Sequence, residues 1–239
     1  SFSVHPYPLS ICELGLATIK QFLDYWQRYG FKYAMFWISY MTQLYNLYVN
    51  TKSKQIHERI VLPKKYIFIP LQVHNDTQVL FNSPFDNMEE FIDTCYAVAR
   101  RILPDFEIVV KEHPMDVTVN YDGLRRKYPS IIWLKNYDIN QVIDYSSYVF
   151  VINSSVGLQA LAKYKKVLVF GSCFYARNPF VETANDNIMA DAALERLKSK
   201  TLDKSCIDRY IAKFKEIFIE GSFFSFDEDT VYAVCGRLL

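Results

Sequence analysis

The sequence has no cysteine or histidine pattern of the kind that binds metal. Its five cysteines are scattered without a CxxC pair, and its four histidines do not cluster with them. Such spacing argues against a structural zinc site and against a disulfide framework. We therefore expect a protein of the reducing cytoplasm.

Signatures of several enzyme classes are also missing. The chain contains no GxxxxGK[ST], which argues against a P-loop NTPase, and no GxSxG or HExxH. No DxD-type acidic pair stands where a metal-dependent sugar transferase would need one. We expect chemistry that uses no metal and no other cofactor.

Charge of one sign is not in excess. Lys and Arg total 27 and Asp and Glu total 26, for a formal net charge of +1, and no long block of like charge occurs. This balance gives no electrostatic case for a nucleic-acid partner. No basic segment precedes a signal-type apolar core. Because the chain starts at Ser1 rather than Met, we expect it to be a piece of a longer protein.

Residues 1–60 form a predicted helical segment that is rich in aromatic residues. Between positions 22 and 48 the aromatic residues recur with a spacing that fits one helical face. No charge occurs between Lys32 and Lys52, but polar residues interrupt this stretch, so it falls short of a spanning helix. Two interpretations stay open: the helix packs on the core or on a missing lobe, or it lies at a membrane interface.

Residues 61–239 alternate between short apolar runs and helical patterns. The runs predict buried strands at 66–71, 106–110, 131–134, 148–152 and 167–170. Helices are predicted at 86–103, 121–127, 139–144, 156–164, 186–198 and 204–219. Strands separated by single helices indicate an α/β domain with a doubly wound parallel sheet. The pattern does not specify the order of the strands.

A dense polar group follows the first strand. It consists of Gln72, His74, Asn75, Asp76 and Gln78. Loops at strand ends are where binding groups concentrate, and an aspartate in such a cleft can act as a nucleophile or general base. The alternative is a solvated turn in which an Asx side chain caps a helix.

A histidine follows the second strand, in the motif Lys111-Glu112-His113-Pro114. Pro114 restricts the backbone of the residue before it, which helps to hold the imidazole in one place. There His113 could donate a hydrogen bond to a phosphate oxygen. The alternative is a structural histidine.

A third motif, Asn153-Ser154-Ser155-Val156-Gly157, follows the strand at 148–152 and leads into a predicted helix. It offers hydroxyls, an amide and the N–H groups of a helix start, which suit an anion. Gly157 lowers helix propensity, which indicates a close backbone approach. An ordinary N-cap would use the same residue types. Since strand ends meet at one edge of a parallel sheet, this motif and His113 could hold one phosphate.

Taken in order, these motifs resemble the bacterial capsule polysaccharide synthesis family, which includes retaining β-Kdo transferases. The resemblance covers residues 66–176, including Asn153-Ser154-Ser155 and the strand that ends at Gly171. It implies the Rossmann-like nucleotide-binding lobe of a GT-B glycosyltransferase and a CMP-activated sugar donor such as CMP-Kdo. It also implies a lipid-linked glycan acceptor and a peripheral place at the inner face of the inner membrane.

The resemblance further implies roles for individual residues. His113, Ser154 and Ser155 would bind the CMP phosphate, with Asn153 and Gly157 in the same motif. Asp76 would attack the anomeric carbon, so that the configuration is retained through a covalent intermediate. Lys111 would neutralise donor charge, and Gln72 and Gln78 would orient the sugar.

Two alternatives stay open. Teichoic-acid-type glycerophosphate polymerases use a similar pairing of motifs with a CDP-alcohol donor and a second histidine as base, a position that His74 could fill. A non-catalytic module that binds nucleotide or polysaccharide is the other alternative. Because a GT-B enzyme has two lobes, we expect the acceptor lobe to be missing here or reduced to the aromatic segment.

Overall fold

A computed structural model describes residues 60–74, 76–116, 119–184 and 187–217 of the chain. The aromatic helix expected before residue 60 lies outside these ranges, as does Asn75. The predicted division of the chain at residue 60 therefore stays a prediction.

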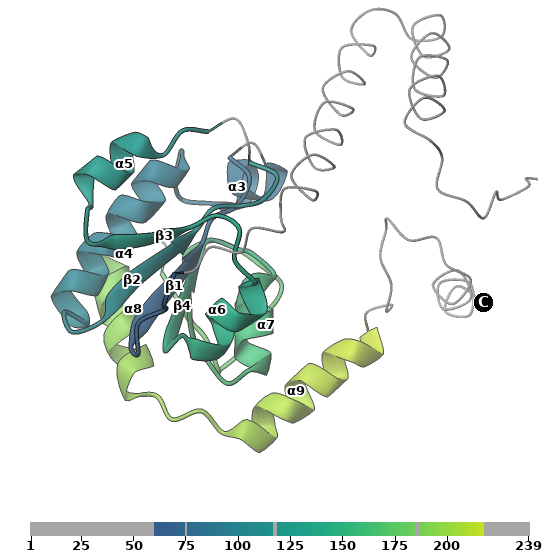
Figure 1. Cartoon of the computed structure of the whole chain (residues 1–239). Helices are drawn as coiled ribbons and strands as arrows, with labels where there is room; N and C mark the ends of the chain where they lie inside the picture. The colour runs from purple at the N-terminus through teal and green to yellow at the C-terminus, as the bar shows by residue number, and fades with distance from the viewer. Residues whose placement is uncertain (1–59, 75, 117–118, 185–186, 218–239) are drawn as a thin grey trace, which may run out of the picture. The chain divides into compact units, whose positions relative to one another are not determined.

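The described part is built on a six-stranded sheet in which all neighbouring strands are parallel (Figure 1). The strands are β1 (Tyr66–Pro70), β2 (Glu107–Lys111), β3 (Ile131–Leu134), β4 (Tyr148–Val151), β5 (Lys166–Val169) and β6 (Glu182–Thr183). Their order is β3-β2-β1-β4-β5-β6. The expected α/β class with a doubly wound, Rossmann-like sheet is confirmed. β6 was not predicted, because a strand of two residues leaves no periodic pattern.

Seven helices are described between and after the strands. They are α3 (Thr77–Asn82), α4 (Met88–Ile102), α5 (Asp122–Lys127), α6 (Ile139–Tyr145), α7 (Val156–Ala162), α8 (Asn187–Ser199) and α9 (Lys204–Ile217). All but α3 lie where the sequence predicts a helix. α3 has six residues, too few for a helical period to stand out.

Helices cover both faces of the sheet (Figure 1). Ile67 and Ile69 of β1 face a core that includes buried residues of α4 and α8. The alternate residues Tyr66 and Phe68 face a second core shared with α6, α7 and α9. Because both faces are covered, β1 is apolar and buried along its whole length, as is typical of a parallel sheet.

The strand order reverses between β1 and β4. The chain builds outward from β1 through β2 to β3, then returns to β4 and builds the other way to β6. In open α/β sheets, ligands bind in the crevice at the carboxyl ends of the strands beside such a reversal. The loops that follow β1, β2, β4 and β5 therefore define where a site is expected.

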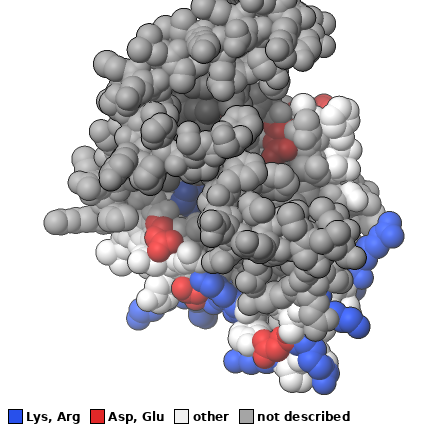
Figure 2. Space-filling view, turned by 90° about the vertical axis from the view of Figure 1, so that its right-hand side faces the viewer, with Lys and Arg blue, Asp and Glu red and all other residues white. Residues whose placement is uncertain are grey.

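Charges of both signs are mixed on the surface. On the face drawn in Figure 2, Lys and Arg side chains of described residues lie beside Asp and Glu side chains. Arg101 of α4, for example, pairs with Asp191 of α8 at 2.8 Å. In the part of the chain that the structure describes, no helix is long and apolar enough to cross a membrane.

Candidate functional site

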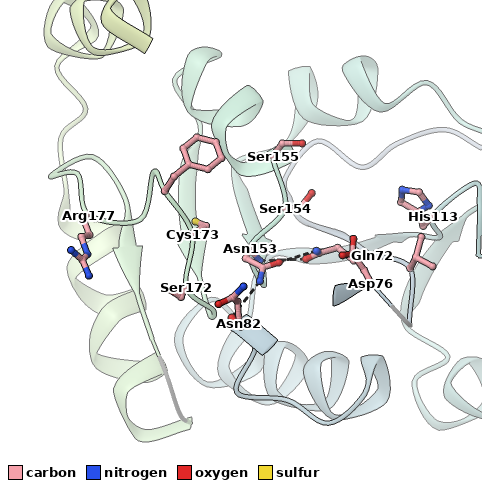
Figure 3. A pocket seen from close by; sticks show the side chains of 12 residues that line it. Gln72, Asp76, Asn82, His113, Asn153, Ser154, Ser155, Ser172, Cys173 and Arg177 are labelled. Carbon is pink, nitrogen blue, oxygen red and sulfur yellow. Dashed lines mark hydrogen bonds between the residues drawn. The ribbon is translucent and has the colours of Figure 1, made fainter. Parts of the chain in front are cut away.

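A cavity of about 860 Å³ opens at the carboxyl ends of the strands (Figure 3). Its volume lies in the range of small-molecule sites. Twelve residues from the loops after β1, β2, β4 and β5, and from the end of α3, line it: Gln72, Val73, Asp76, Asn82, His113, Asn153, Ser154, Ser155, Ser172, Cys173, Phe174 and Arg177. Six of the residues predicted from sequence are thus brought together: Gln72, Asp76, His113, Asn153, Ser154 and Ser155.

Hydrogen bonds between four lining residues hold one side of this pocket together. Gln72 Nε2 donates to Asn153 Oδ1 at 2.9 Å, and the Asn153 backbone N–H donates back to Gln72 Oε1 at 3.3 Å. Asn153 Nδ2 donates to the carbonyl of Asn82 at 3.3 Å, which also accepts from Ser172 N–H at 2.9 Å. Both Gln72 and Asn153 are buried. Their amides join the loops, which gives Gln72 a positioning role, and the expectation that it also orients the sugar stays a prediction.

Asp76 lies partly buried in the pocket wall, just before α3 begins. Its backbone N–H donates to the Val73 carbonyl at 3.0 Å, and its carbonyl accepts from Leu80 N–H at 2.9 Å. These bonds fix the backbone on both sides of the side chain. A carboxylate is therefore held in the pocket at the carboxyl end of β1.

His113 lies in the same pocket, at the carboxyl end of β2. Its Nδ1 accepts a hydrogen bond from Met115 N–H at 3.2 Å, so in the neutral ring the proton is on Nε2. Burial, and then the nearby charge of Lys111, lower the pKa of His113 below its usual value of 6.5. At neutral pH the ring is uncharged and donates through Nε2–H.

Ser154 and Ser155 lie after β4. Ser154 Oγ accepts from Val156 N–H at 3.2 Å, and the Ser154 carbonyl accepts from Gly157 N–H at 3.0 Å. Ser155 is the N-cap residue of α7, but its exposed side chain makes no capping hydrogen bond. α7 has only seven residues and its first two N–H groups already have acceptors. The Val156 and Gly157 N–H groups are thus used within the loop, while the exposed hydroxyl of Ser155 makes no capping bond. The expected anion site at the helix start stays a prediction.

Gly157 does not line the pocket. A Cβ atom at this position would overlap the phenol ring of the buried Tyr175. The close approach that the glycine indicated is therefore real, but a protein side chain makes it. The structure gives Gly157 a packing role, and its expected role as a ligand-binding residue stays a prediction.

His74 and Lys111 also lie outside the pocket lining. His74 Nδ1 is 2.7 Å from Oδ1 of Asp116, whose side chain is 1% exposed and also accepts from Tyr121 Oη at 3.1 Å. Lys111 Nζ donates to the carbonyls of Glu112 and Lys135. The structure thus places both residues beside the pocket, and the charge of Lys111 lowers the pKa of His113. Their expected roles toward a ligand stay predictions. The side chain of Gln78 lies outside the described residues.

Sequence reasoning missed the far wall of the pocket, which is made by Asn82 and residues 172–177. The latter follow the carboxyl end of β5, so the rule applied to the other strands would have found them. Among them, burial raises the pKa of the Cys173 thiol, which keeps it protonated at neutral pH. Within the described ranges, no group of three or more His, Cys, Asp or Glu residues could hold a metal ion.

The fold and the pocket define a Rossmann-like α/β domain with a polar ligand site at the reversal of strand order. The model of one family, described as capsule polysaccharide biosynthesis protein, matches residues 19–224. The chain therefore belongs to the capsule polysaccharide biosynthesis proteins, as the motifs predicted.

Individual relatives match over part of the chain. Protein FixF of Sinorhizobium fredii is 31% identical over 146 residues, which are 61% of this chain and 36% of that protein. The capsule polysaccharide export protein KpsS of Escherichia coli is 26% identical over 137 residues, 51% of this chain and 35% of that protein. The chain thus spans about a third of the length of these relatives. Among solved structures, the Thermosulfurimonas dismutans KpsC β-Kdo 2,7 transferase superimposes with a TM-score of 0.43 and 23% identity, over 63% of this chain and 52% of that one.

Proposed function

We propose that the chain carries the donor-binding site of a glycosyltransferase of capsule or surface polysaccharide synthesis. The donor is a CMP-activated sugar of the Kdo type, and the acceptor is a lipid-linked glycan. One observation carries the proposal: Asp76, His113 and Ser155 come from three different strand ends and line a single pocket. Membership of the capsule family supports the same class of reaction.

The donor phosphate binds between His113 and the serines in this proposal. Nε2–H of the neutral His113 donates to one phosphate oxygen, and the hydroxyl of Ser155 donates to another. Hydrogen bonds to an ionised acceptor are about twice as strong as neutral ones. The Gln72–Asn153 pair joins the loops after β1 and β4, which fixes the Ser155 loop relative to β1, the strand that pairs with β2 and so lies beside the His113 loop.

Asp76 is the proposed nucleophile. Its carboxylate attacks the anomeric carbon, the bond from that carbon to the phosphate oxygen breaks, and CMP leaves with the electron pair. The acceptor hydroxyl then displaces the carboxylate and loses its proton. Two displacements at one carbon retain its configuration.

The glycerophosphotransferase alternative needs a second histidine as base. His74 is the candidate, but it lies outside the pocket lining and is held by Asp116. The position of Asp76 inside the pocket favours sugar transfer instead.

Calorimetric titration with CMP, CDP-glycerol and UDP tests the donor assignment. We expect CMP to bind the chain and the His113→Ala variant to lose this binding while its thermal melting stays normal. Binding of CDP-glycerol alone would favour the glycerophosphotransferase. Binding of none of the three would contradict a donor site in this chain.

Substitution of Asp76 tests the mechanism. Asp76→Asn should lower CMP release from CMP-Kdo by about a thousandfold or more and leave CMP affinity within a few fold. The matched control is Asp105→Asn, an exposed aspartate outside the pocket. Donor binding without any turnover by the unsubstituted protein would favour the non-catalytic module. Full activity in EDTA is expected, because the proposed mechanism uses no metal.

A further inference from the structure

Arg177 lies in the loop between β5 and β6, at the wall of the pocket away from His113. In Figure 3, Arg177 and His113 stand at opposite ends of the labelled residues, with Asn153 between them. Arg177 is the only Lys or Arg among the twelve residues that line the pocket. The proposed phosphate site lies on the other side of Asn153, so Arg177 is left for a different group.

The backbone around Arg177 is held on both sides. Tyr175 is fully buried, and its hydroxyl donates to the carbonyl of Ser154. Asn178 Nδ2 donates to the carbonyl of Tyr175, and Asn178 Oδ1 accepts from Phe180 N–H at 2.7 Å. The loop that carries Arg177 is therefore joined to Ser154 through Tyr175, and hydrogen bonds of Asn178 within the loop hold it on the other side of Arg177.

The side chain of Arg177, in contrast, has no partner in the described part of the chain. It is exposed, and no hydrogen bond or ion pair joins it to a described residue. Arg101 and Arg196 on the surface have such partners, Asp191 and Glu182. The exposed Arg126 of α5 is, among the described residues, unpaired like Arg177, but it lies outside the pocket. A fixed backbone thus presents an unpaired guanidinium to a polar pocket.

We propose that Arg177 binds a second oxyanion of the donor, separate from the phosphate held at His113 and Ser155. A guanidinium matches a carboxylate or phosphate with two parallel hydrogen bonds, which a lysine cannot reproduce. Two groups have this chemistry: the carboxylate of an acidic sugar and the second phosphate of a nucleoside diphosphate. This inference rests on the proposed function and assigns to Arg177 the selection of the donor.

The test compares three ligands on four proteins. CMP, CDP and CMP-Kdo are titrated into Asp76→Asn alone and into Asp76→Asn combined with Arg177→Gln, with Arg177→Lys or with the control Arg126→Gln. Arg126 is exposed on α5 and does not line the pocket. The Asp76→Asn substitution is present throughout, so that CMP-Kdo is bound without turnover.

We expect Arg177→Gln to lower the affinity for one of the two ligands that carry two oxyanions, CDP or CMP-Kdo, by about 10- to 100-fold. The affinity for CMP should change by less than about twofold. Arg177→Lys should lose part of the same affinity, and Arg126→Gln none of it. A selective loss for CMP-Kdo assigns the carboxylate, and one for CDP assigns the second phosphate.

An equal change for all three ligands, or no change for any, would overturn the role of Arg177 while CMP binding still supports the donor site. If the unsubstituted chain bound no CMP, the proposed function itself would fail, and the inference with it. The two failures are thus told apart by the CMP titration alone.

Discussion

The side chain of Gln72 binds Asn153 through two hydrogen bonds, one to its side-chain oxygen at 2.9 Å and one from its backbone N–H at 3.3 Å, across the point where the strand order reverses. Gln72 follows β1 and Asn153 follows β4, so 81 residues of sequence separate them. Asn153 also reaches the carbonyl of Asn82. These bonds join the loops after β1 and β4, which carry Asp76 and Ser155, and the loop after β2, which carries His113, lies next to them. The relative positions of the three residues therefore depend on these bonds.

Asn153→Ala should therefore affect both stability and binding. The substitution removes one hydrogen bond from the buried Gln72 amide and one from the Asn82 carbonyl. We expect this loss to lower the free energy of unfolding by about 1–3 kcal/mol. Urea denaturation measures this loss, and calorimetry should show weaker CMP binding in the folded variant. Gln141→Ala, an exposed amide on α6, should change neither quantity.

His113 should titrate below 6.5 in an NMR experiment, with the neutral ring protonated on Nε2. Its pKa is lowered by burial and then by Lys111, so Lys111→Met should raise it. As the pH falls below 6.5, the unfolded chain takes up this proton before the folded one. The contribution of His113 to stability therefore falls as the pH drops from 6.5 to the folded pKa, stays at the lowered value below it, and is unaffected well above 6.5. An unchanged His113 pKa in Lys111→Met would contradict the electrostatic role given to Lys111.

His74→Ala should act through the loop that holds His113. It removes one of the hydrogen-bond partners of Asp116, a carboxylate whose side chain is 1% exposed. We expect the free energy of unfolding to fall by about 1–3 kcal/mol. His74→Asn keeps a donor near the position of Nδ1 and should recover much of this loss. Sugar transfer should survive in His74→Asn. Its complete loss in a folded His74→Asn protein would restore His74 as a base.

The fold class could be predicted from sequence because a buried parallel strand leaves a continuous apolar run. Tyr66–Pro70 and Tyr148–Val151 are such runs, and the helices between strands have a clear period. The strand order could not be predicted, since the pairing of β1 with β4 depends on contacts between distant segments. α3 was not predicted for another reason: its six residues are too few for a helical period to stand out.

The site was predictable where polar residues follow a strong strand and carry a distinctive motif. His113 and Ser155 were found in this way, and Arg177 was missed although it follows β5. The partner of the close approach at Gly157 could not be predicted from sequence. A glycine shows that something approaches closely, but only the folded chain shows that Tyr175 does so.

The aromatic segment at 22–48 predicts association with membranes. Co-sedimentation of the intact chain with anionic phosphatidylglycerol vesicles should show binding, because Tyr and Trp side chains favour the interface. Because Trp26 and Trp37 lie in this segment, their fluorescence should change when the vesicles bind. Absence of binding, with both tryptophans inaccessible to a soluble quencher, would favour packing of this segment against protein.

Gly157→Ala should destabilise the protein without a direct effect on the ligand. The added Cβ overlaps the Tyr175 phenol, and overpacking of this kind costs about 1–3 kcal/mol. Tyr175→Phe removes the hydroxyl and should relieve part of the overlap, so the two substitutions should show a favourable coupling of about 0.5 kcal/mol or more in a double-mutant cycle. If Gly157 instead approached the donor, Gly157→Ala would weaken CMP binding at unchanged stability, and Tyr175→Phe would not compensate. A favourable coupling in stability thus indicates packing against Tyr175, and its absence together with weaker CMP binding indicates ligand contact.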